Sequence, residues 1–472
     1  MRPATLPVAC ALALAGCLAV VDVPAPAPTL DIIGEPIVQT HDHEDASLHT
    51  ERANMRLVAW NPLIPEAFPN EGFAGFWIHG HHAFVATDGA YAGFVVVDLS
   101  DAANPRLVSQ YKTAGGASQE TRVTPDGKWL FLNLQREPGA VDLVADPARG
   151  TGYGIQVVDV SDPAKPRFES FMPVEVLGSH TIFYREIGGV GWLFFTEQPL
   201  RRGTPDGTVY TTPTGNAVGI ARFEDVGGTM RLVRVAEYRY APSVAARTSQ
   251  GCFPHDVWVE PHPVTKQEIL YVSHWDCGAI TVDVSDPARP RELSVWDDPK
   301  PSALNRIHFF RPDPTPRAGR IVAWSGPEID QSPGEPGWFR AYDVTDPARL
   351  RQIGAWRLPG AVENDMPFIF SPHNFDFRGD LMAVAHYHAG VWVLNVSDPT
   401  AARAVGFYLP HGHEDEPFAG KVWRKTPNFP IAYLPNAYDA RWYDDPATGR
   451  TVIVATERGT GLYVLEYTGP DR

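Results

Sequence analysis

The feature that most constrains the fold of this chain is an internal repeat. Each copy reads as an alternating apolar strand, a Ser/Thr-Asp turn and a second strand that ends in an aromatic residue. The copies are GFVVVDLSDAANPRLVSQY (93–111), GIQVVDVSDPAKPRFESF (154–171), GAITVDVSDPARPRELSVW (278–296), WFRAYDVTDPARLRQIGAW (338–356) and GVWVLNVSDPTAARAVGFY (390–408), with a degenerate copy at 218–238. In such turns an Asp side chain accepts hydrogen bonds from the backbone and Pro fixes φ, so the pattern predicts tight strand connections.

Two further strands precede each copy, so four strands, here termed A to D, recur at intervals of about 45–75 residues. The 41 Gly and 45 Pro residues agree with many short strands and with few long helices. Strand A of the seven units is expected to begin near Ala74, Glu120, His180, His255, His308, His373 and Tyr438.

The seventh unit ends at residues 461–467 without a strand D, whereas residues 55–60 near the N-terminus have the strand D pattern. We therefore predict an all-β fold over residues 51–472, a seven-bladed β-propeller closed by an N-terminal strand that completes blade seven. Ring closure of this kind leaves no sheet edge unpaired. The alternative, an open β-solenoid, would expose the edges of the first and last units.

The strand C motifs VVVD (95–98), IQVVD (155–159) and AITVD (279–283) resemble the LVIVD-repeat family, and the resemblance covers about residues 55–467. It implies an extracellular or envelope-bound propeller and leaves the activity open.

The N-terminal residues predict export and a lipid anchor. Residues 1–17, MRPATLPVACALALAGC, have a short basic start and an apolar run too short to span a bilayer, as in a secretory signal peptide. The end of this run resembles the bacterial lipobox, which implies cleavage and lipidation at Cys17; an ordinary secretion signal is the alternative. A Pro-rich tether over 18–50 would then hold the domain off the membrane. We expect a lipoprotein of the bacterial cell envelope, periplasmic or surface-exposed.

The remaining two cysteines, Cys252 and Cys277, are expected to form a disulfide, because an even pair in an oxidising compartment is typical of one. The net charge of −16 argues against nucleic acid as a partner. The sequence contains no phosphate-binding loop, no HExxH motif and no GxSxG nucleophile elbow.

Histidines gather on one face of the predicted propeller. The starts of strands A and the ends of strands B lie on the same face, which we call the top face, and its connections are longer than those of the opposite face. His180, His255, His308 and His373 all occupy the start of strand A, the innermost strand, in four consecutive blades. Neutral imidazoles backed by carboxylates suit Cu, Fe or Zn, so these four residues are the predicted metal ligands.

Five further residues are expected to support this site or to transfer protons there. They are Glu120, Glu197, His274, His386 and Glu457. His388 lies just beyond His386, whereas His79, His81, His82 and His262 fall at turns of the opposite face and are left out of the site. HDHED (41–45) and HGHED (411–415) are weaker candidate metal tracts, or ordinary solvated loops.

A structural interpretation of the histidines stays open, because repeats duplicate packing residues together with the fold. The motif PHD at 254–256 is weakly similar to the selenium-binding protein and methanethiol oxidase type, and four histidines from separate blades are weakly similar to carotenoid-cleavage oxygenases. Neither family's wider motifs are present.

Three functional hypotheses follow from these features. The first is a lipid-anchored binding module that recognises an envelope protein, a glycan or a small ligand on its His-rich top face. The second is a metal-dependent enzyme, for example an oxidoreductase, with Cu, Fe or Zn at the channel mouth. The third is a structural scaffold within an envelope assembly.

Overall fold

The computed structural model describes fourteen segments of the chain. They are residues 52–64, 72–113, 116–136, 146–175, 177–197, 201–203, 209–211, 216–240, 253–275, 277–296, 307–328, 338–358, 371–410 and 436–470. The predicted signal peptide, Cys17, the tether over 18–50, Cys252 and the tract at 411–415 lie outside the described residues, so the predictions made for them stay predictions.

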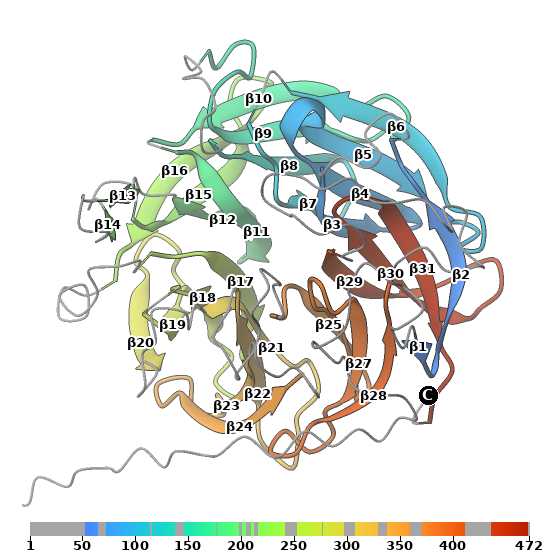
Figure 1. Cartoon of the computed structure of the whole chain (residues 1–472). Helices are drawn as coiled ribbons and strands as arrows, with labels where there is room; N and C mark the ends of the chain where they lie inside the picture. The colour runs from blue at the N-terminus through green and yellow to red at the C-terminus, as the bar shows by residue number, and fades with distance from the viewer. Residues whose placement is uncertain are drawn as a thin grey trace, which may run out of the picture.

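Seven antiparallel sheets, six of four strands and one of five, are arranged around a common axis, which confirms the predicted β-propeller (Figure 1). Blade one contains β3 (Phe73–His79), β4 (His82–Thr87), β5 (Gly93–Asp98) and β6 (Arg106–Lys112). Blade two contains β7 (Thr121–Val123), β8 (Trp129–Leu134), β9 (Gly154–Asp159) and β10 (Arg167–Pro173). Blade three contains β11 (Ser179–Ile187), β12 (Val190–Glu197), β15 (Val218–Asp225) and β16 (Met230–Tyr238). Blade four contains β17 (Asp256–Pro261), β18 (Glu268–Ser273), β19 (Ala279–Asp283) and β20 (Arg291–Trp296).

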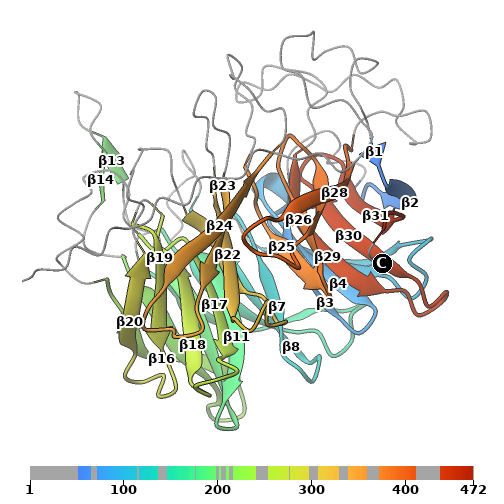
Figure 2. The same ribbon diagram turned by 90° about the horizontal axis from the view of Figure 1, so that it is seen from below.

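The other three blades complete the circle. Blade five contains β21 (Ile307–Pro312), β22 (Val322–Pro327), β23 (Trp338–Asp343) and β24 (Arg351–Arg357). Blade six contains β25 (Phe375–Arg378), β26 (Leu381–Ala385), β27 (Val391–Asn395) and β28 (Arg403–Tyr408). Blade seven contains β29 (Ala437–Asp444), β30 (Thr451–Glu457), β31 (Gly461–Tyr467) and β2 (Met55–Asn61). A hairpin of β13 (Arg201–Gly203) and β14 (Val209–Thr211) and a 3₁₀ turn, η3 (Gly89–Tyr91), lie outside the blade sheets. Seen from the side, the strands of the blades run between the two faces of the ring (Figure 2).

The ring is closed by the N-terminal strand, as predicted. Strand β2 pairs antiparallel with β31, from Met55 opposite Tyr467 to Asn61 opposite Leu462. The sequence did not predict that the preceding two-residue strand, β1 (Arg52–Ala53), adds to the outer edge of blade six through β28. Strands β1 and β2 therefore pair with two neighbouring blades and cover a backbone edge on each.

The repeated turns follow the predicted mechanism, because the Asp after the Ser/Thr accepts a backbone N–H, as Asp162 does from Ala164 at 3.1 Å. The last residue of strand C accepts a hydrogen bond from the backbone N–H two residues later, as Asp159 does from Ser161 at 3.0 Å. The same carboxylate pairs with the first residue of strand D, at 2.5 Å between Asp159 and Arg167. The equivalent pairs are Arg106–Asp98, Arg291–Asp283 and Arg351–Asp343. In blade six the acid is replaced by Asn395, which still accepts the bond from Ser397 at 3.0 Å.

Aromatic and arginine side chains from the A strands fill the centre of the ring. Trp258 lies against Phe183 and Phe309, with ring centroids 4.4 and 5.7 Å apart, and the Arg311 guanidinium lies 4.2 Å from the Trp258 ring. Because this layer packs across the axis, side chains at the starts of the A strands lie above a filled channel. Among the described residues, no helix has the length and apolar character needed to cross a membrane.

Candidate metal centre

The four predicted histidines lie side by side around the top of the channel. Adjacent ring centroids are 4.3 Å apart for His180 and His255, 4.8 Å for His255 and His308, and 4.0 Å for His308 and His373. Tyr438 of blade seven continues the series, 3.7 Å from His373. Because the same position of strand A recurs in every blade, one residue type repeated at that position becomes an arc of neighbours.

A carboxylate that the sequence analysis did not single out lies within this arc. Glu328 follows β22 directly, and its Oε2 is 3.1 Å from Nε2 of His255 and 3.9 Å from Nε2 of His308. The other oxygen, Oε1, is 3.9 Å from Nε2 of His373. His255, His308 and Glu328 are buried, and one possible ligand atom of each lies within 4.8 Å of the others. This buried His/Glu group could hold a metal ion.

Hydrogen bonds fix which ring nitrogen carries the proton in two of the histidines. Nδ1 of His373 lies 2.7 Å from the carbonyl oxygen of Tyr438, and Nδ1 of His180 lies 2.6 Å from Oε1 of Gln135. Both oxygens can only accept, so each Nδ1 carries the proton and each Nε2 keeps its lone pair. A backbone or amide oxygen behind the ring is the usual support of a metal-binding histidine.

Burial keeps the central imidazoles neutral. It lowers the pKa of His308 to about 3, against the opposing effect of the Glu328 carboxylate, and it lowers the pKa of His373 well below its ordinary value. Among the described residues, neither Nδ1 of His308 nor Nε2 of His373 has a hydrogen-bond partner. Buried polar atoms of this kind are costly unless a ligand satisfies them.

Two aromatic residues next to the arc are held in the left-handed backbone region. Trp275 has φ 45° and Tyr387 has φ 38°, and each is the second residue after strand B of its blade. The Trp275 ring stacks on His255 at 4.1 Å, whereas the Tyr387 hydroxyl donates to Oε1 of Glu328 at 2.5 Å. Non-glycine residues rarely adopt this conformation, and when they do they cluster at functional sites.

Glu120, one of the expected supporting residues, belongs to a buried layer of charges. Its Oε2 lies 3.0 Å from Arg122 and accepts the backbone N–H of Ile182 at 3.4 Å. Burial raises the pKa of Glu120 and, further, that of Asp256, the residue after His255. Glu120 thus links strand A of blade two to strand A of blade three.

Glu197 and Glu457 are engaged elsewhere. Glu197 pairs with Arg234 of strand D in its own blade. Glu457 accepts the backbone N–H groups of Asn436 at 2.7 Å and Gly459 at 3.0 Å, while burial raises its pKa to about 7. The hydrogen bonds and ion pairs of both carboxylates therefore hold connections and strands of their own blades.

His274 and His386 turn towards the preceding blade. The His274 ring lies 4.9 Å from Tyr240, just after β16, and the His386 ring lies 6.1 Å from Trp356 in β24. Burial lowers the pKa of each to about 3, as it does for the neighbouring His388. These histidines occupy the seams between blades and lie outside the group around Glu328.

The sequence contained a signal for Glu328. Glu328 follows the end of strand B in blade five, as His274 does in blade four and His386 in blade six. In the sequence, this position falls in a long connection between strands B and C of blade five. No comparable signal indicated Tyr387, because its contact with Glu328 depends on the left-handed backbone.

The repeats of this chain are similar to a known repeat family. The LVIVD repeat model matches residues 74–113, 151–171 and 268–298. Among solved structures, Sqt1 of Saccharomyces cerevisiae is 9% identical with a TM-score of 0.46, covering 85% of this chain and 97% of that chain. A protein from Lactobacillus plantarum is 10% identical with a TM-score of 0.44, covering 68% of this chain and 80% of that chain. No curated protein is similar to this chain in sequence.

Proposed function

Because the chain is a seven-bladed β-propeller that contains LVIVD repeats, we propose that it is a binding module whose ligand centre is a transition-metal ion on the top face. The observation that carries this proposal is the buried Glu328 carboxylate, which the Nε2 atoms of His255, His308 and His373 surround. Three imidazoles and one carboxylate form a donor set suited to Zn, Cu or Fe, whereas Ca and Mg prefer oxygen cages.

The framework favours metal binding because little has to be ordered when the ion arrives. Each ligand lies in, or within two residues of, a strand of a rigid blade, and His373 is already oriented by the carbonyl of Tyr438. Tyr387 orients the carboxylate through its bond to Oε1. Such preorganised ligands lose little conformational entropy on binding.

Metal analysis of protein purified without an affinity tag tests the proposal, with Glu328→Gln as the diagnostic variant. This change keeps the shape of the side chain and removes its charge. Glu197→Gln is the matched control, because Glu197 is also buried at the end of a strand B but pairs with Arg234. We expect Glu328→Gln to bind about one equivalent of Zn²⁺ less than the wild type, and Glu197→Gln to bind as the wild type does. Equal binding by all three proteins, with unchanged circular dichroism, would contradict the proposal.

A metal-dependent oxidoreductase is the second candidate, favoured by the Tyr387 phenol that donates directly to Glu328. Sustained O₂ consumption by the copper-loaded protein with ascorbate, above that of a His255→Gln/His308→Gln variant, separates this candidate from a simple binding module. A copper-loaded protein that consumes no more O₂ than this variant would argue for binding alone.

We also propose that the module is anchored to the bacterial cell envelope by lipidation at Cys17 and recognises an envelope protein, a glycan or a small ligand. The support is the lipobox-like end of residues 1–17 and the length of the top-face connections. The expected Cys252–Cys277 disulfide belongs to this exported state. Cys277 is fully buried four residues after β18, and Cys252 lies outside the described residues.

A further inference from the structure

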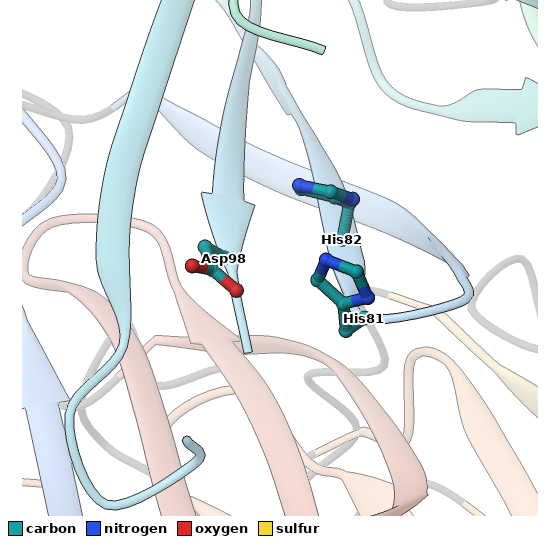
Figure 3. A group of neighbouring side chains, drawn as sticks. All are labelled: His81, His82 and Asp98. Atoms are coloured by element: carbon teal, nitrogen blue, oxygen red, sulfur yellow. The ribbon is translucent and has the colours of Figure 1, made fainter. Parts of the chain in front are cut away.

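A second group of possible metal ligands lies on the opposite face of the ring, at the turn between β3 and β4. It contains His81, His82 and Asp98, with one possible ligand atom of each within 4.8 Å of the others. The rings of His81 and His82 lie side by side, with centroids 4.3 Å apart, and Asp98 ends the neighbouring strand β5 (Figure 3). The sequence analysis had left these histidines out of the predicted site.

Strand pairing explains why His82 and Asp98 meet. The two residues are direct cross-strand partners, and His79 is the partner of His82 on the other side. Directly opposite residues of an antiparallel pair project from the same face of the sheet, about 4.5–5.5 Å apart at Cβ. His81 adds the third donor because it belongs to the tight turn at Gly80, which has φ 57°.

The equivalent positions of other blades show that His82 is not required by the fold. The cross-strand partner of the strand C residue is Trp129 in blade two, Ile269 in blade four, Val322 in blade five and Leu381 in blade six. An apolar side chain serves there because it covers the end of the sheet. In blade one an imidazole replaces it, next to a carboxylate and beside a second imidazole.

The charge state of the group suits a metal ion. Burial, with the neighbouring His81, lowers the pKa of His82, so its imidazole is neutral at pH 7. Hydrogen bonds from Ser100 and the Arg106 guanidinium outweigh desolvation and lower the pKa of Asp98 to about 2, so its carboxylate is ionised. The hydrogen bonds from Ser100 and Arg106, at 2.8 and 2.6 Å, also hold the carboxylate in place.

We propose that His81, His82 and Asp98 form a second, solvent-accessible transition-metal site on the turn face of blade one. His81 is exposed and the other two are half-buried, so a metal held here reaches solvent. Zn²⁺ is four-coordinate in most protein sites, and three protein ligands leave one position open. That position can take water or a donor atom from another molecule. This site lies on the opposite face of the ring from the buried group around Glu328 and shares no residue with it, so the two are independent.

The repeat supplies a matched pair of variants for the test. Asp98→Asn removes the charge, and blade six shows that Asn at this position keeps the turn, because Asn395 accepts the same backbone hydrogen bond. Asp159→Asn makes the identical change in blade two, where Trp129 replaces the histidine. Both variants lose an Arg–Asp pair, so they differ only in the proposed metal site.

Zn²⁺ binding to tag-free, full-length protein is measured by equilibrium dialysis. We expect Asp98→Asn to weaken one class of site at least about tenfold, Asp159→Asn to bind as the wild type does, and His82→Gln to lose one equivalent. A His255→Gln/His308→Gln variant should retain this class of site, so failure of the buried centre and failure of this site are distinguishable. Equal Zn²⁺ binding by Asp98→Asn and Asp159→Asn, or an unchanged stoichiometry in His82→Gln, would overturn the proposal.

Discussion

Replacing His386 should reduce the acid sensitivity of the propeller. His386 is fully buried against Trp356, and burial lowers its pKa to about 3. The unfolded chain takes up a proton near pH 6.5, whereas the folded protein does not, so the free energy of unfolding falls as the pH drops from about 6.5 towards 3. For these two pKa values, the loss between pH 7 and pH 5 is about 2 kcal/mol. A folded pKa of about 4 would change this figure little, because almost no proton is bound at pH 5 in either case.

The substitution His386→Leu removes this proton uptake and keeps a side chain of similar volume. Urea denaturation of the wild type and the variant at pH 7 and pH 5 gives the two losses of stability. We expect the variant to lose about 2 kcal/mol less than the wild type over this interval. Contributions of carboxylates and of the other buried histidines cancel in the comparison, because both proteins contain them.

Trp356→Phe is the control for packing, since it alters the same contact without changing a titratable group. It should keep the wild-type dependence on pH even if it lowers stability at both values. If His386→Leu and the wild type lost equal stability between pH 7 and pH 5, the folded protein would have to protonate His386, and the reasoning from burial would be wrong.

Three further predictions concern the closure of the ring and the exported state. Deleting residues 55–61 removes the partner of β31 and should cause aggregation, measured by light scattering, whereas deleting residues 20–40 should leave the protein monodisperse; equal behaviour would contradict closure by β2. Cys17→Ala should release the protein into the detergent-poor phase of a Triton X-114 partition, and an unchanged membrane fraction would exclude lipidation there. Unfolded, unreduced protein from the native host should contain no thiol from Cys252 or Cys277, and reduction should cost about 3–4 kcal/mol of stability; two titrated thiols would refute the disulfide.

The repeat made most of the architecture predictable. Alternation and turn residues identified the seven A strands to within about two residues and identified β2 as the missing strand of blade seven, because these signals are local. The pairing of β1 with β28 could not be predicted in this way, because a two-residue strand has no periodicity of its own.

The candidate site was predictable in its positions and less so in its contacts. A histidine repeated at the start of strand A had to lie near the axis, and the four rings are neighbours. Which side chains turn inward also depends on irregularities in the pairing of strands A and B. The register of this pairing shifts between Ile307 and Phe310 in blade five and between Ala437 and Asp439 in blade seven. The A–B pair of blade four, β17 and β18, has no such shift. A sequence pattern does not locate these irregularities, so the inward direction of Glu328 and the seam positions of His274 and His386 emerged from the structure.

Blade seven combines β2 with β29, β30 and β31, which are far from it in sequence, and this also affects how the protein folds. Strand β2 is synthesised before the strands of blades one to six and its partner β31 after them, and the Trp60 indole donates to the carbonyl of Thr460 across 400 residues. Closing a loop of that length costs about 3 kcal/mol more in chain entropy than closing one of 20 residues. Six blades can assemble from local hairpins, whereas the seventh has to wait for both ends of the chain. We therefore expect closure of blade seven to be the slow step of folding, and until it occurs the strand edges that β2 covers would be open to other chains.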